Sequence, residues 1–164
     1  MAQELRRTLP GGRMESRVIN AVGIWFYSIA TNRYLYLLRN DPKYPETWGL
    51  AGGKCEGNET LMTTIYRECS EELGSMPEYV KLVPIEKFTS PDNKFCYHTF
   101  FCLVEKEFIP ILNHEHVGYS WINSRTWPRP MHPGLWSTVN MHDVIQKIET
   151  IRQIQTSQLE INSG

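Results

Sequence analysis

The sequence predicts an α/β or α+β sandwich in which helices pack on a sheet. Runs rich in Val, Ile, Trp, Phe and Tyr are mixed with amphipathic helical segments, a pattern typical of layered folds. The chain has 164 residues, a length that favours one domain. Its hydrophobic content of 41% and charged content of 21% are near the averages of globular proteins. We therefore expect a leader over 1–16, one domain over 17–154 and a polar tail over 155–164.

Five segments have the composition of strands. The first is rich in Val, Ile, Trp, Phe and Tyr, which suits a strand buried on both faces. Turn signals at Thr31-Asn32 and at Ser90-Pro91-Asp92-Asn93 separate neighbouring strands. The predicted strands are residues 17–29, 33–39, 79–88, 95–108 and 117–122.

Two segments have the periodicity of helices. In residues 60–73 apolar side chains recur at three- and four-residue intervals and form one stripe, and Gly74 is the expected C-cap. The residues of this stripe are Met62, Ile65, Tyr66, Cys69 and Leu73. A second helix is predicted from Pro133 to about Ile154. Its inner face contains Leu135, Val139, Val144, Ile148 and Ile151.

Charge and cysteine content exclude some classes. Seventeen Lys and Arg residues against 18 Asp and Glu leave a formal charge of −1, so we expect no extended nucleic-acid surface. The longest apolar run, residues 21–30, is far shorter than the ~20 residues of a membrane-spanning helix. The cysteines Cys55, Cys69, Cys96 and Cys102 lack paired metal-ligand spacing, and we expect small buried hydrophobes in a reducing compartment. This predicts a cytoplasmic protein.

The first helix has an unusual cluster of carboxylates. Glu68, Glu71 and Glu72 occupy positions i, i+3 and i+4 beside the apolar stripe, so they share a narrow arc. Like charges at this spacing destabilise a helix by about 0.2–0.5 kcal/mol per pair. Arg67 can pair with Glu71 at i+4, but no Lys or Arg is expected to face Glu68 or Glu72. A hard divalent cation such as Mg²⁺ would convert this repulsion into binding.

An acidic run on a helix is usually a solvated face, and that interpretation remains open for an isolated helix. Here the turn Gly52-Gly53 comes just before the helix, where its backbone carbonyls can add a ligand. Glu59 also precedes the helix, within reach of Arg67 once the loop folds back.

The spacing of these residues resembles the Nudix box, Gly-x5-Glu-x7-Arg-Glu-U-x-Glu-Glu-x-Gly-U, where U is a bulky aliphatic residue. All seven fully specified positions match: Gly53, Glu59, Arg67, Glu68, Glu71, Glu72 and Gly74. Cys69 and Ser75 replace aliphatic residues, and Ala51 replaces a common proline. The resemblance implies a Nudix-like α/β/α sandwich, with a mixed sheet flanked by helices.

The resemblance also implies site roles. The Gly53 carbonyl and the Glu68 and Glu72 carboxylates would bind Mg²⁺ or Mn²⁺, and Glu71 would be a further ligand or hold a bound water. Glu59 and Arg67 would fix the loop against the helix and orient Glu68.

Two further residues are implied outside the box. Glu115 comes before the strand that contains Trp121. The resemblance implies that it would be an extra metal ligand or the general base, and the alternative is a plain surface residue. Arg39 would contact substrate phosphate, or is a charge that caps a strand end. The segment 91–98 is a candidate wall of a base pocket, and His114 and His116 are expected in a substrate loop or facing solvent.

The implied activity is metal-dependent hydrolysis of a diphosphate linkage in a nucleoside diphosphate linked to another group. The compact chain favours a free nucleoside triphosphate, standard or oxidised. Two alternatives stay open: a nucleotide-binding module without turnover, and a pyrophosphohydrolase acting on RNA 5′ ends. A homodimer is compatible with the resemblance.

Overall fold

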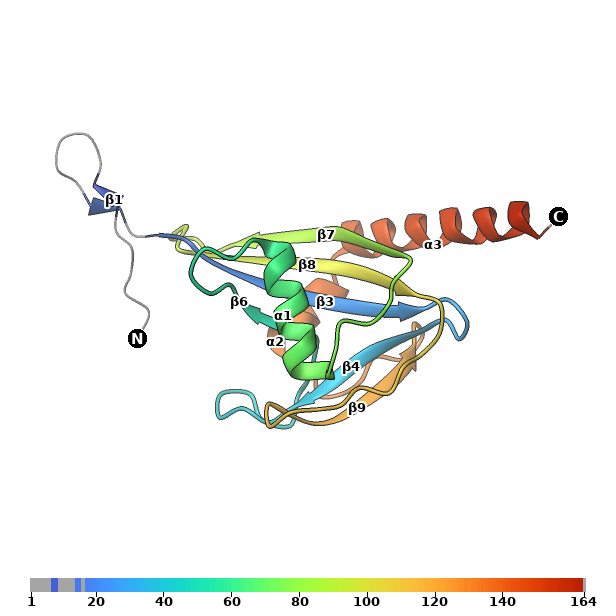
Figure 1. Ribbon diagram of the computed structural model, residues 1–164, viewed down its shortest axis with the longest axis horizontal. Coiled ribbons are helices and arrows are strands. Elements are labelled where there is room, and N and C mark those ends of the chain that lie inside the picture. The colour runs from blue at the N-terminus through green and yellow to red at the C-terminus, as the bar shows by residue number, and fades with distance from the viewer. Residues whose placement is uncertain (1–6, 9–13, 16, 164) are drawn as a thin grey trace.

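The fold is a seven-stranded mixed sheet with helices on both faces (Figure 1). The computed structural model describes residues 7–8, 14–15 and 17–163. The strands are β1 (Arg7–Thr8), β2 (Met14–Glu15), β3 (Ile19–Ser28), β4 (Arg33–Arg39), β5 (Trp48–Gly49), β6 (Ala51–Lys54), β7 (Lys81–Thr89), β8 (Phe95–Val104) and β9 (His116–Asn123). The helices are α1 (Leu61–Leu73), α2 (Pro133–Val139) and α3 (His142–Asn162). Most of the expected leader, 1–16, lies outside the described residues; within it β1 and β2 form an antiparallel pair.

The sheet is organised around β3. Its strand order is β5-β4-β3-β8-β7, with β6 added to β3 and β9 added to β4. β3 and β8 are parallel over ten residue pairs, and the other pairs are antiparallel. All five predicted strands are present, and the second has the predicted bounds. The short strands β5 and β6 were not predicted, because a glycine-rich segment carries no strand signal of its own.

Side chains of β3 alternate between two cores. Val22, Ile24 and Phe26 pack in the core beneath α1, whereas Trp25 and Tyr27 pack in the core beneath α2 and α3. This confirms that β3 is buried on both faces. The α/β/α sandwich implied by the sequence is therefore the observed architecture.

Helix α1 begins and ends at identifiable caps. The Thr60 hydroxyl accepts a hydrogen bond from the Thr63 N–H at 3.1 Å, and Gly74 ends the helix with φ of 92°. The predicted stripe is partly wrong, because Met62 and Tyr66 are 42% and 43% exposed. Glu68 and Glu72 are buried instead, so the buried face of α1 is rotated towards the carboxylates.

The predicted helix over 133–154 is wrong, because this segment forms two helices, α2 and α3. The break lies at Asn140 and Met141, where the apolar spacing from Val139 to Val144 is five residues instead of three or four. Residues 155–162, expected as a frayed polar tail, continue α3 (Figure 1).

The cysteines and the helices bear on two expectations drawn from composition. The four cysteines are free; Cys55 is half-buried and the other three are buried, as predicted. Among the described residues no helix combines the length and apolar character that crossing a membrane requires.

Candidate active site

The site forms where α1 packs on β6. Glu68 and Glu72 are one helical turn apart, so both carboxylates face this strand; their residues are 8% and 3% exposed. The Gly52 N–H donates a hydrogen bond to Oε2 of Glu72 at 2.7 Å. A Cβ on Gly53 would lie 2.4 Å from Oε1 of Glu68, so any side chain at this position would displace this carboxylate.

Glu115, from the loop before β9, joins the same cluster. One carboxylate oxygen from each of Glu68, Glu72 and Glu115 lies within 4.8 Å of the others. The Glu115 N–H donates to Oδ1 of Asn113 at 3.0 Å, and the Glu115 carbonyl accepts from the Asn40 N–H at 2.9 Å. These bonds fix the loop against the end of β4.

Burial raises the pKa of the two helix carboxyls. The pKa of Glu72 rises to about 9, because burial outweighs the opposing hydrogen bond from Gly52. Burial also raises the pKa of Glu68, against the opposing charge of Arg67. Three clustered carboxyl groups, two of them buried, form a donor set that fits a hard divalent cation, which would favour their ionised forms.

Arg67 links the loop before α1 to the helix. Its Nε donates to Glu59 Oε2 at 2.8 Å and its Nη2 to the Lys54 carbonyl at 2.9 Å. Its Nη1 lies 3.0 Å from Glu68 Oε1 and 3.2 Å from Glu71 Oε2. Hydrogen bonding from Arg67 lowers the pKa of Glu59 to about 2.

These contacts decide three sequence expectations. The pairings of Arg67 with Glu59 and Glu71 are confirmed. The expectation that no Arg or Lys faces Glu68 is wrong, because the flexible Arg67 side chain folds back onto its own neighbour. Glu71 is exposed, and its carboxylate is not part of the cluster formed by Glu68, Glu72 and Glu115.

A pocket of about 440 Å³ adjoins the cluster and contains Glu72 and Glu115 in its wall. Arg39 is in the same wall, where it forms an ion pair with Asp41. Tyr97 also lines the pocket, so part of the segment 91–98 does contribute to it, although this residue lies in β8.

Sequence reasoning missed Asn40, Asp41 and the buried state of His116. His116 lines the pocket but is only 7% exposed, and its Nδ1 has no hydrogen-bond partner among the residues that the structure describes. Burial lowers the pKa of His116 to about 4. The run Arg39-Asn40-Asp41 at the end of a strand was the available signal for two of these residues.

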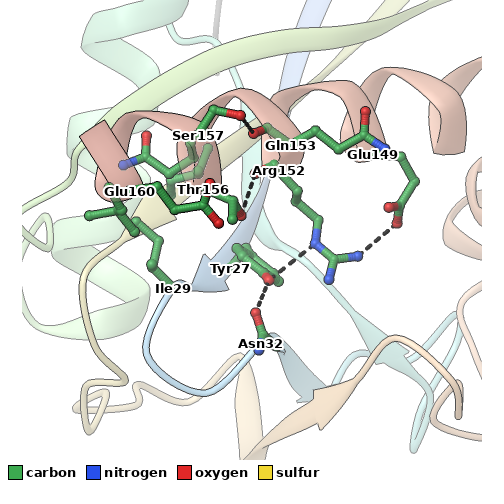
Figure 2. A pocket seen from close by; sticks show the side chains of 12 residues that line it. Tyr27, Ile29, Asn32, Glu149, Arg152, Gln153, Thr156, Ser157 and Glu160 are labelled. Carbon is green, nitrogen blue, oxygen red and sulfur yellow. Dashed lines mark hydrogen bonds and ion pairs between the residues drawn. The ribbon is translucent and has the colours of Figure 1, made fainter. Parts of the chain in front are cut away.

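A second pocket, of about 420 Å³, lies under α3 and is lined by different residues (Figure 2). Several of its polar groups already have partners inside the protein. Tyr27 donates to Asn32, and Arg152 donates to both Tyr27 and Glu149. None of the three clustered carboxylates lines it, so we place the candidate active site at the pocket beside α1.

Comparisons with known proteins identify similar chains. The NUDIX domain family profile matches residues 18–139. The dihydroneopterin triphosphate diphosphatase of Haemophilus influenzae is 32% identical over 127 residues, which cover 68% of this chain and 78% of that protein.

Two solved structures share the fold. The MutT NUDIX hydrolase from Burkholderia pseudomallei has a TM-score of 0.55 at 19% identity, covering 75% of this chain and 98% of that chain. The Nudix hydrolase RenU from M. smegmatis has a TM-score of 0.59 at 14% identity, covering 94% and 96%.

Proposed function

Because the chain belongs to the Nudix family of hydrolases, we propose that it is a metal-dependent pyrophosphohydrolase acting on a free triphosphate. The observation that supports this most directly is the cluster of Glu68, Glu72 and Glu115 beside the pocket. A carboxylate cluster next to a pocket with an arginine suits a polyphosphate that arrives with divalent cations.

We assign the cation to Glu68 and Glu72, with the Gly53 carbonyl as a further ligand, and keep Glu115 as the proton acceptor. When bound, Mg²⁺ or Mn²⁺ neutralises phosphate charge and lowers the pKa of water. The protein residues then have separate tasks. Arg67 holds Glu68 at 3.0 Å, and the Gly52 N–H holds Glu72 at 2.7 Å.

Glu115 is the proposed proton acceptor for the attacking water, because it is the exposed carboxylate of the cluster. Arg39 receives a substrate phosphate, and Glu71 supports Arg67 through their 3.2 Å contact.

Two substrate groups are candidates. A free nucleoside triphosphate, standard or oxidised, suits a pocket of about 440 Å³ in a chain of 164 residues. Dihydroneopterin triphosphate is the second candidate, because the Haemophilus influenzae relative is named for it. Both are heterocycles that carry a triphosphate.

The test is release of phosphate and pyrophosphate from a substrate panel. The panel includes standard and oxidised nucleoside triphosphates, dihydroneopterin triphosphate, ADP-ribose, a dinucleoside polyphosphate and a triphosphorylated RNA. We expect turnover of a free triphosphate with Mg²⁺ or Mn²⁺, none with EDTA, and a loss of at least about 10²-fold in Glu72→Gln.

The matched control is Glu78→Gln, which neutralises an exposed glutamate just beyond α1 and should behave as wild type. Tight binding of a panel member without turnover under either metal would refute the enzyme and favour a binding module. Preferential turnover of the RNA would instead favour the 5′-end activity.

A further inference from the structure

Arg39 and Asp41 form an ion pair in the wall of the pocket that also contains Glu72 and Glu115. Oδ2 of Asp41 accepts a hydrogen bond from Nε of Arg39 at 2.5 Å and lies 2.5 Å from its Nη2. The two side chains are 30% and 29% exposed. The pair is therefore partly shielded from solvent and adjoins the pocket.

Asp41 is itself held rigidly. Its Oδ1 accepts hydrogen bonds from the N–H groups of Lys43 at 3.0 Å and Tyr44 at 2.8 Å. The bond from Tyr44 is the main reason that the pKa of Asp41 is lowered, so this carboxylate stays ionised at neutral pH. The loop is closed at its base, where the Arg39 N–H donates to the Thr47 carbonyl at 2.8 Å.

This arrangement fixes one edge of the Arg39 guanidinium and leaves another edge available. Asp41 takes Nε and Nη2, whereas Nη1 donates no hydrogen bond within the described part of the chain. The Arg39 side chain also lies against Gly49, where an added Cβ would be 3.4 Å from its Cδ. A guanidinium with a free planar edge binds a phosphate group through two parallel hydrogen bonds.

Without Asp41, Arg39 would be a mobile cation in the wall of the pocket that also contains the carboxylates of Glu72 and Glu115. An Arg–carboxylate pair there would compete with a divalent cation for the same oxygen atoms. On the premise of the proposed function, we propose that Asp41 is a positioning residue: it directs Arg39 towards the substrate phosphates and keeps it away from the carboxylate cluster.

The test compares Asp41→Asn with a matched control, Asp92→Asn. Asp92 makes a similar turn between β7 and β8, where its Oδ1 accepts from the Lys94 N–H at 3.0 Å, and it does not line the pocket. For the best triphosphate substrate we expect Asp41→Asn to raise KM about tenfold, as expected for losing a hydrogen bond to a charged group. We expect kcat to change by less than about twofold and half-activation to need more Mg²⁺. Asp41→Glu should restore part of the loss.

A merely structural role is tested by a double-mutant cycle. Because Asp41 acts through Arg39, Asp41→Asn should change KM no further in an Arg39→Ala background. Equal KM values for Asp41→Asn and Asp92→Asn, a lower KM in Asp41→Asn, or full additivity with Arg39→Ala would each overturn the proposal.

A binding measurement separates this proposal from the proposed function. Inorganic tripolyphosphate is titrated into the protein by calorimetry in EDTA, so that no turnover is needed. We expect binding about tenfold weaker in Asp41→Asn than in wild type and in Asp92→Asn. If wild type hydrolyses no panel member, the proposed function fails, and this titration alone decides the role of Asp41: equal affinities would overturn it.

Discussion

Glu72 combines a titratable side chain with almost complete burial. It is 3% exposed, and the backbone N–H of Gly52 is the hydrogen-bond donor that faces its Oε2. A Cβ at position 52 would lie 2.0 Å from the Val22 carbonyl oxygen, and the backbone there has φ of 145°. The N–H that fixes Glu72 therefore depends on glycine at this position.

The neighbouring Gly53 permits a test at the scale of one methyl group. In Gly53→Ala the Cβ would lie 2.4 Å from Oε1 of Glu68, so this carboxylate must move. We expect a loss of about 10²-fold in kcat/KM, as for other small misplacements of catalytic groups. Gly118→Ala in β9 is the matched control, because its Cβ would make an ordinary 3.7 Å contact with Leu38. Equal activity in the two variants would contradict the importance of this close approach.

Helix α3 is the element whose role the family match leaves open, since that match ends at residue 139. Val144 and Ile148 of α3 are 4% and 1% exposed and pack in the same core as Trp25. The buried half of α3 is therefore part of the domain core, although its end is not.

This assignment predicts a difference between two isoleucines of α3. We expect Ile148→Ala to lower the free energy of unfolding by about 2–5 kcal/mol, because it leaves a cavity in the core. Ile161→Ala should change it by less than about 0.5 kcal/mol, because Ile161 is 77% exposed. Urea denaturation measures both values. A small effect of Ile148→Ala would show that α3 is dispensable to the domain.

Elements differed in how well the sequence predicted them. Residues 33–39 and the end of α1 follow local rules, namely a run of tyrosine and leucine and a glycine C-cap at Gly74, and both were predicted correctly. The N-cap at Thr60 was not predicted, because this residue was placed inside the helix. The break between α2 and α3 was missed because the five-residue apolar step from Val139 to Val144 was taken as continuous.

The site shows the same division between local and long-range information. Fixed spacing within one segment predicted the pairing of Glu59, Arg67 and Glu71. The Asp41–Arg39 pair is local, and the run Arg39-Asn40-Asp41 carried a signal for it that was not used. The burial of His116 depends on how the loop after β4 packs beside β9, which no local pattern encodes. Tertiary packing therefore decides the pocket wall.

The sandwich as a whole brings four distant segments together at one point. Gly53 comes from β6, Glu68 and Glu72 from α1, Glu115 from the loop before β9, and Arg39 from the end of β4. These segments lie on strands paired to β3 or β4 and on the helix that covers them. The central claim is that this meeting point is a divalent cation site.

Calorimetric titration of the cation-free protein with Mg²⁺ or Mn²⁺ near pH 7.5 tests this claim most directly. In that state the pKa of Glu72 is about 9, so its carboxyl is mostly protonated, and cation binding must release the proton. Titrations in buffers of different ionisation enthalpy should show about one proton released per bound cation. Glu72→Gln should bind more weakly and lose this release, whereas Glu78→Gln should match wild type. Absence of cation binding, or equal proton release in wild type and Glu72→Gln, would contradict the account.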